Sequence, residues 1–279
     1  MTPLLKRTIG SALLVVVLVG CLLLHPLLYA VLFACGMAVM MNEFYRMSIG
    51  RNTHTITRTM MIALCTAFFL AFVLFRLYQI DMKWLLLAFP LLAVVLIAVI
   101  FDKEDRIERL TAQDLCFPAV YLLPSFVISS LLLVSRDGAY SPDLFLAVIV
   151  LVWMSDVGAY ATGMCFGQKD GSRRPAPTIS PRKSWAGVIG GLVFTVVTAV
   201  CLHLLGIFSL QLWHWIVAAL IVVVFGIFGD LFESLLKRHY GVKDAGNILI
   251  GHGGLLDRFD GALMAIPVVT VFFILVNII

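Results

Sequence analysis

Residues 212–236, LWHWIVAALIVVVFGIFGDLFESLL, contain no Asp, Glu, Lys or Arg before Asp230. A helix of about 20 mainly apolar residues is long enough to cross the ~30 Å hydrocarbon core of a bilayer. The stretch therefore predicts a transmembrane helix. It also carries Asp230 and Glu233 close to its end, where a carboxylate is costly unless it has a partner.

Similar apolar runs extend outward from this stretch through the whole chain of 279 residues. Hydrophobic residues make up 62% of the sequence and the mean hydropathy is +1.05, whereas soluble domains are about 45–50% apolar. We therefore expect an all-α fold, a polytopic membrane helical bundle with about nine transmembrane helices. The predicted spans are 9–24, 27–41, 59–77, 83–101, 115–135, 143–164, 185–207, 212–236 and 259–279.

The distribution of basic residues predicts the orientation of these spans. Cytoplasmic loops of membrane proteins carry an excess of Lys and Arg. With the N-terminus inside, only Arg76, Lys83 and Arg136 of the 20 Lys and Arg residues fall on the outer side. The two longest polar segments, near 165–184 and 237–258, are then predicted to face the cytoplasm. The six cysteines lie singly, which is typical of small apolar residues rather than of a disulfide framework.

A stripe of polar residues follows one side of the span at 212–236. Asp230, Glu233, Ser234 and Lys237 are spaced i, i+3, i+4 and i+7, so they share a helix face. Asp230 would lie roughly 10 Å below the cytoplasmic end, which makes it a functional candidate. A structural ion pair with a basic neighbour is the alternative. Asp156 has a similar predicted depth in the span 143–164, so both could approach one cavity.

A second acidic pair, Asp257 and Asp260, stands at the start of the last span. At i, i+3 the two carboxylates point the same way, toward a site that a hard cation such as Mg²⁺ could fill. Helix capping by Asp257 is the alternative. The segment between the last two spans is rich in glycine, and its backbone N–H groups could approach phosphate. The neighbouring groups that could neutralise phosphate are Lys237, Arg238, Lys243 and His252.

These motifs resemble a known family. The segment 234–260, SLLKRHYGVKDAGNILIGHGGLLDRFD, is similar to the signature of the phosphatidate cytidylyltransferases, or CDP-diacylglycerol synthases: Ser-x-x-Lys-Arg, Lys-Asp, His-Gly-Gly and Asp-Arg-x-Asp. The segments SDVGAYATG at 155–163 and ISPRKSW at 179–185 also look like that family's. The chain departs from the family at Ile250, where Pro is usual, and at Ala186, where Glu is usual. The first departure affects loop stiffness, and the second removes an acid that could orient a base.

The resemblance implies transfer of a cytidylyl group from CTP to phosphatidate, giving CDP-diacylglycerol and pyrophosphate. It implies a catalytic region at 115–279 after N-terminal helices at 1–114, all in one integral membrane unit of the bacterial inner membrane. The expected catalytic residues are Asp230, Asp257, Asp260, Lys237 and Arg238. The same three aspartates are the expected Mg²⁺ ligands, with Asp156 as a further candidate and a second cation left open. The expected substrate-binding residues are Ser180, Lys183, Ser184, Ser234, Lys243, Asp244, His252, Gly253, Gly254 and Arg258.

The implied partners are CTP, phosphatidate and membrane lipids, without nucleic acid, and a homodimer is left open. Two other functions remain as alternatives. A CTP-dependent lipid kinase would use a similar site but transfer the terminal phosphoryl group. A cation-coupled secondary transporter would explain Asp156 and Asp230 but not the basic, Gly-rich segment.

Overall fold

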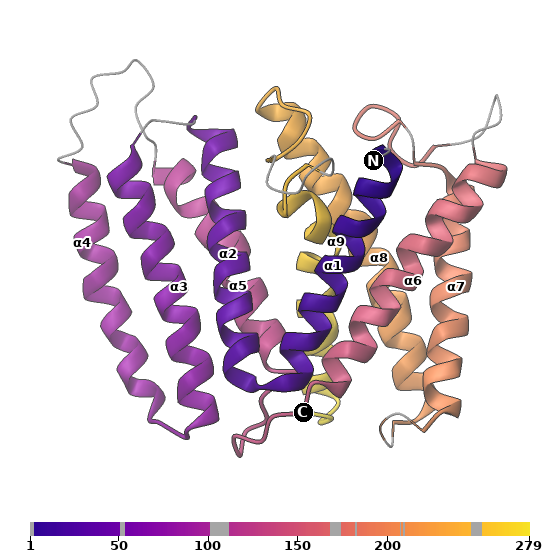
Figure 1. The fold of residues 1–279 in the computed structure, drawn as a ribbon, viewed down its shortest axis with the longest axis horizontal. Coiled ribbons are helices and arrows are strands. Elements are labelled where there is room, and N and C mark those ends of the chain that lie inside the picture. The colour runs from indigo at the N-terminus through magenta and orange to yellow at the C-terminus, as the bar shows by residue number, and fades with distance from the viewer. Residues whose placement is uncertain are drawn as a thin grey trace. The chain divides into compact units, whose positions relative to one another are not determined.

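The protein is mainly helical in the part of the chain that the computed structural model describes, which is residues 3–50, 54–100, 112–167, 174–181, 183–206, 208, 210–246 and 253–279 (Figure 1). Within these ranges, nine α-helices and one 3₁₀ helix are formed, and an isolated bridge joins Val134 to Tyr140. The helices are α1 (Pro3–Leu24), α2 (Pro26–Ser48), α3 (Thr55–Leu77), η1 (Met82–Leu87), α4 (Ala88–Ile100), α5 (Ala112–Ser130), α6 (Asp143–Phe166), α7 (Trp185–Leu204), α8 (Leu212–His239) and α9 (Leu256–Leu275).

Eight of the nine predicted spans each correspond to one α-helix, and the predicted span 83–101 corresponds to η1 followed by α4. The predicted fold class is confirmed. Six helices among the described residues, α2, α3, α6, α7, α8 and α9, are long and apolar enough to cross a membrane. Three further apolar helical segments are shorter: Ala12–Leu24, Met82–Val95 and Asp114–Ser130. The protein is therefore a polytopic helical membrane protein, with six helices that meet the full length requirement.

Local sequence explains where several helices begin and end. His25 precedes Pro26 at the start of α2, and its Nδ1 accepts a hydrogen bond from the Leu27 backbone N–H at 3.1 Å. Ser184 begins α7 in the same way, since its Oγ accepts from the Gly187 N–H at 3.2 Å. Such caps satisfy backbone donors that have no partner within the helix. Beyond the end of α8, Gly241 adopts a positive φ of 68°, a conformation that glycine tolerates without strain.

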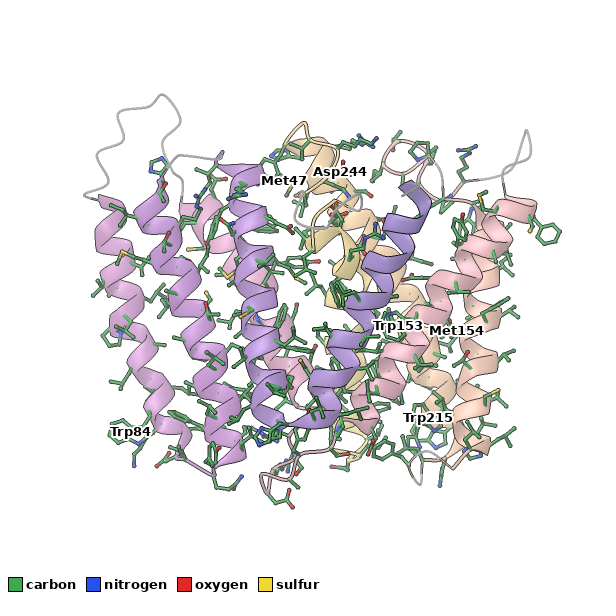
Figure 2. All side chains as sticks on the ribbon, in the orientation of Figure 1. Met47, Trp84, Trp153, Met154, Trp215 and Asp244 are labelled. Atoms are coloured by element: carbon green, nitrogen blue, oxygen red, sulfur yellow. The ribbon has the colours of Figure 1, made fainter. Side chains whose placement is uncertain are left out.

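The chain divides into two compact units, residues 1–140 with 242–258, and residues 141–241 with 259–279. The division falls inside α9, between Arg258 and Phe259. The expected functional boundary at 114/115 lies within the first unit and stays a prediction. In the first unit, α2 packs against α1, α3 and α5. Trp84 in η1 is half exposed and points away from its helix (Figure 2), as is typical of tryptophan at a membrane interface.

Small residues bring α6 and α7 close together in the second unit. A Cβ atom added to Gly187 would lie 3.0 Å from the Ala159 carbonyl oxygen, and one added to Gly191 would lie 3.0 Å from the Ser155 carbonyl oxygen. Thr162 adds a hydrogen bond from its hydroxyl to the Ala186 carbonyl at 3.0 Å. Close approach through small residues is a common way of packing membrane helices. It fixes α6, which carries Asp156, against the segment that carries Lys183.

The crossing of α8 and α9 also depends on glycine, and it yields a testable prediction. A Cβ at Gly229 would collide with the Asp260 carbonyl oxygen and lie 2.9 Å from the Gly261 Cα, whereas one at Gly226 would meet nothing within 4 Å. Gly229→Ala should therefore destabilise the protein by about 1–3 kcal/mol because the backbone of α9 must move. Gly226→Ala, one turn away on α8, is the matched control and should be tolerated. Thermal unfolding of both variants in detergent measures the difference, and equal melting temperatures would contradict the assigned crossing.

Candidate active site

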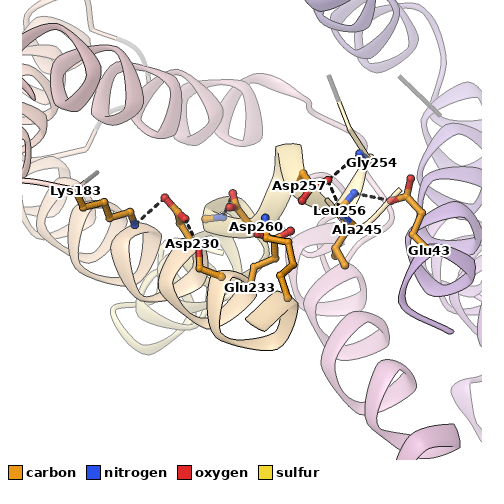
Figure 3. A network of polar contacts seen from close by, with 12 residues as sticks. Glu43, Lys183, Asp230, Glu233, Ala245, Gly254, Leu256, Asp257 and Asp260 are labelled. Carbon is orange, nitrogen blue, oxygen red and sulfur yellow. Dashed lines mark hydrogen bonds and ion pairs between the residues drawn. The ribbon is translucent and has the colours of Figure 1, made fainter. Parts of the chain in front are cut away.

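Four chain segments of the second unit bring charged groups together: Asp156 from α6, Lys183 from the segment before α7, Asp230 from α8 and Asp260 from α9. We call these four residues the carboxylate cluster. Lys183 Nζ lies 2.7 Å from Asp230 Oδ2 and also donates to the Ile227 carbonyl oxygen at 3.3 Å (Figure 3). Ser234, one turn along α8, donates to Asp230 Oδ1 at 3.3 Å. Asp230 is thus held from two sides.

The charges within the carboxylate cluster are unbalanced. Asp260 interacts electrostatically with Asp230, Asp156 and Lys183, and Asp156 interacts with Asp230 and Lys183. The ion pair considered as the alternative for Asp230 is therefore present, with Lys183 as the base. Within the described part of the chain, however, this one lysine is shared by three carboxylates. Like charges held together are unfavourable unless a proton or opposite charge is supplied.

The donor set of the carboxylate cluster fits a hard cation, because carboxylate oxygens are the ligands that Mg²⁺ prefers. Among the residues that the structure describes, no group of three or more His, Cys, Asp or Glu side chains has the geometry of a metal site. Asp156, Asp230 and Asp260 interact through their charges. Binding of Mg²⁺ at these residues stays a prediction.

Glu233 and Lys237 form a second ion pair on α8. Lys237 Nζ lies 2.5 Å from Glu233 Oε2, and Glu233 is only 2% exposed. The predicted polar stripe therefore contains two pairs of contacts, Ser234 with Asp230 and Lys237 with Glu233. Arg238, the next of the predicted catalytic residues, is exposed at the end of the helix. The ammonium group of Lys237 is therefore paired with a buried carboxylate.

In the first unit, Asp257 organises the segment that precedes α9. Its Oδ2 accepts hydrogen bonds from the backbone N–H groups of Ala245, at 3.0 Å, and Gly254, at 2.8 Å (Figure 3). A helix-capping side chain accepts from N–H groups that follow it in the chain. Both donors precede Asp257, so its contacts differ from those of a cap. They join residue 245 to residue 254 across the intervening chain.

Glu43 on α2 is a functional candidate that sequence reasoning missed. Its Oε1 accepts from the Leu255 N–H at 3.0 Å and its Oε2 accepts from the Leu256 N–H at 2.9 Å, so a residue more than 200 positions away caps α9. Glu43 is 1% exposed. The predicted span ended at residue 41, which placed Glu43 in a surface loop. A single acid in the apolar segment MMNEFYRM was the available signal.

The other predicted substrate-binding residues differ in how exposed they are. In the first unit, Lys243, Asp244 and Arg258 are exposed. Gly253 adopts a positive φ of 79°, and a Cβ there would lie 2.8 Å from Asp257 Oδ2. The Gly254 N–H, a predicted phosphate donor, is donated to Asp257.

The remaining predicted residues belong to the second unit, with one exception. Ser180 lies in the turn before α7, where its carbonyl accepts from the Lys183 N–H at 3.2 Å. Ser184 is buried and caps α7. His252 falls outside the described residues. The assignment of substrate contacts to all of these residues stays a prediction.

The chain is similar in sequence to a known family and to several of its members. The model of the cytidylyltransferase family matches residues 5–276. Phosphatidate cytidylyltransferases of Staphylococcus haemolyticus and Staphylococcus saprophyticus are each 40% identical to this chain over 129 residues, which is 46% of this chain and 48% of each relative. That of Thermotoga maritima is 38% identical over 184 residues, 64% of this chain and 65% of the relative. The chain thus spans about half the length of the staphylococcal relatives it matches.

Proposed function

Because the chain belongs to the cytidylyltransferase family, we propose that it transfers a cytidylyl group from CTP to phosphatidate, forming CDP-diacylglycerol and pyrophosphate for phospholipid synthesis. The relatives that match it carry the name of this activity. The observation that carries the proposal is the carboxylate cluster. It gathers acids from three helices around a lysine, in an integral membrane protein, which suits the meeting of a polyphosphate with a lipid phosphate.

We place the reaction at the cytoplasmic side of a bacterial inner membrane. The support is the distribution of Lys and Arg, which leaves only Arg76, Lys83 and Arg136 on the opposite side of the predicted topology. The relatives reported above are bacterial proteins. CTP is water-soluble and phosphatidate is held in the bilayer, so a site at the headgroup level gives both substrates access.

In the proposed reaction, an oxygen of the lipid phosphate attacks the α-phosphorus of CTP, and the bond to the β-phosphate breaks to release pyrophosphate. The lipid phosphate is already ionised near neutral pH, so the protein need not supply a nucleophile. Its contribution is alignment of two anionic substrates and neutralisation of their charge. Lys183 and Lys237, each held by a carboxylate, would orient phosphate groups, and Arg238, Lys243 and Arg258 are exposed cations that would attract them.

We propose that Asp230 and Asp260, both in the second unit, hold Mg²⁺, with Asp156 as a further donor. The role of Asp257, which belongs to the first unit, as a Mg²⁺ ligand stays a prediction. The ion would supply positive charge to the nucleotide phosphates. Asp230 already has Lys183 and Ser234 as partners, which fix the direction of its carboxylate. Asp257 accepts two backbone hydrogen bonds through Oδ2.

The test is an assay of the purified protein in mixed micelles with CTP labelled in the α-phosphate and with phosphatidate. We expect label in the lipid fraction, release of pyrophosphate, and loss of both when Mg²⁺ is chelated. Formation of CDP with a newly phosphorylated lipid would instead identify a lipid kinase. Cation-dependent uptake into liposomes without turnover of CTP would identify a transporter, and either result would overturn the proposal.

A further inference from the structure

Glu43 stands out because it is a buried acid on an apolar helix that the proposed reaction does not use. Burying a carboxylate is costly unless hydrogen bonds or opposite charge compensate. Here the compensation comes from the Leu255 and Leu256 N–H groups at the start of α9, where the helix dipole also favours negative charge. The charged groups with which Glu43 interacts electrostatically are Arg46, one turn along α2, and Asp257.

We call the described residues before α9, 242–246 and 253–255, the segment. Two of its glycines, Gly246 and Gly254, lie directly on the Glu43 carboxylate. A Cβ on Gly246 would overlap Glu43 Oε1, and its next neighbours would be Glu43 Cδ at 2.7 Å and Cγ at 2.9 Å. A Cβ on Gly254 would lie 2.8 Å from Glu43 Oε2 and 2.8 Å from the Gly246 nitrogen. Neither glycine has a positive φ. Close approach to Glu43, rather than backbone conformation, is therefore the reason that these positions need glycine.

The same segment is held from the other side by Asp257, which accepts from Ala245 and Gly254. Backbone N–H groups at both ends of the segment, at 245 and at 254–256, are thus donated to two carboxylates, one from α2 and one from α9. Only the Glu43 carboxylate comes from outside this part of the chain. Removal of Glu43 would free the segment and the first turn of α9 from α2.

We propose that Glu43 is a positioning residue for the transferase site: it fixes the described residues before α9, 242–246 and 253–255, and the start of α9, and thereby the positions of Lys243, Asp244 and Asp257. It acts through these residues. The inference rests on the proposed function for its effect on turnover, and on the contacts alone for its effect on the order of the segment.

The first experiment separates positioning from folding. Glu43→Ala should lower kcat by about 100-fold, because displacement of reacting groups by an ångström has effects of this size. Glu43→Gln keeps the shape of the side chain and one acceptor oxygen, so its kcat should lie between those of Glu43→Ala and the wild type. Both should retain a cooperative thermal transition, and kcat is expressed per folded molecule. Asp81→Asn, which changes an exposed acid paired with Lys83, is the matched control. Wild-type kcat in folded Glu43→Ala would overturn the proposal.

The second experiment uses the contact between Glu43 and Gly246. In the wild type, Gly246→Ala introduces a methyl group against the carboxylate and should lower turnover. In the Glu43→Ala background the three nearest atoms are gone, so the same substitution should have little further effect. A merely destabilising change would instead reduce turnover by the same factor in both backgrounds, and that outcome would contradict the assigned contact.

Hydrogen exchange of the segment gives a readout that is independent of catalysis. Amide exchange at 253–256 should accelerate about tenfold or more in Glu43→Ala, since hydrogen bonds to a charged group are lost. If the wild type does not turn over CTP and phosphatidate, the proposed function fails, yet faster exchange would still identify Glu43 as the residue that orders the segment. Unchanged exchange in Glu43→Ala would overturn the positioning role.

Discussion

Asp230→Asn is expected to reduce turnover of CTP and phosphatidate by about 1000-fold, at the upper end of the losses seen when a single group that stabilises transition-state charge is removed. Asp230 is the centre of the carboxylate cluster. It pairs with Lys183, accepts from Ser234 and interacts electrostatically with both Asp156 and Asp260. Asparagine preserves the shape of the side chain and one oxygen, so the loss of turnover measures the contribution of the negative charge of Asp230.

The stability of Asp230→Asn should respond differently from its turnover. Neutralising Asp230 relieves its repulsion with Asp156 and Asp260 but leaves Lys183 without its ion-pair partner, so the melting temperature should change little. Radiolabelled CTP and thermal unfolding measure the two properties on one preparation. Asp81→Asn is the control, because it removes an exposed acid that also pairs with a lysine, at 2.8 Å. Full turnover by Asp230→Asn would remove Asp230 from the proposed catalytic set.

The sequence predicted the helices well and their ends less well, for a physical reason. Hydropathy marks the apolar part of a helix, and the helix continues wherever its backbone hydrogen bonds continue. The predicted spans at 9–24 and 27–41 are therefore shorter than α1 (Pro3–Leu24) and α2 (Pro26–Ser48). The missing part of α2 contains Glu43. Because the predicted end of this helix was a few residues too early, Glu43 was not recognised as a buried acid.

Contacts that follow from helical periodicity could be predicted from the sequence. Contacts between distant segments could be predicted only in part. The spacing of Asp230, Ser234, Glu233 and Lys237 on one stripe is the spacing of the hydrogen bond and the ion pair that α8 forms. The approach of Asp156 to Asp230 was predicted from their similar depth, and an electrostatic interaction between the two carboxyl groups accords with it. The pairing of Asp230 with Lys183 depends on how α7 packs, which no local pattern specifies.

The glycine-rich segment illustrates a different limit. Its composition predicted backbone N–H groups that contact phosphate. In the structure, the N–H groups of Ala245, Gly254, Leu255 and Leu256 are donated to Asp257 and Glu43. Carboxylates and phosphates both accept hydrogen bonds from the backbone N–H groups at a helix N-terminus. Composition alone therefore does not distinguish a ligand site from an internal contact. In the proposed function, side chains such as Lys243 would bind the phosphate.

Lys183→Met should lower kcat/KM for CTP by about 100-fold while it tightens the apparent binding of Mg²⁺. Within the described residues, Lys183 is the base shared by Asp156, Asp230 and Asp260. Its removal takes away a cation that would orient phosphate, which lowers turnover. It also leaves the three carboxylates more negative and frees Asp230 Oδ2, which favours a divalent ion. The two effects have opposite directions, so a general loss of structure would not reproduce them.

Titration of turnover with Mg²⁺ measures both quantities in the same experiment. The half-saturating Mg²⁺ concentration should fall in Lys183→Met, and Lys183→Arg, which keeps the charge, should restore part of the turnover and the wild-type Mg²⁺ requirement. Lys83→Met is the matched control because Lys83 also forms an ion pair with an aspartate but is exposed, on the predicted outer side. If Lys183→Met instead required more Mg²⁺ than the wild type, the lysine would not compete with the cation for Asp230, and the ion would have to be sought at other carboxylates.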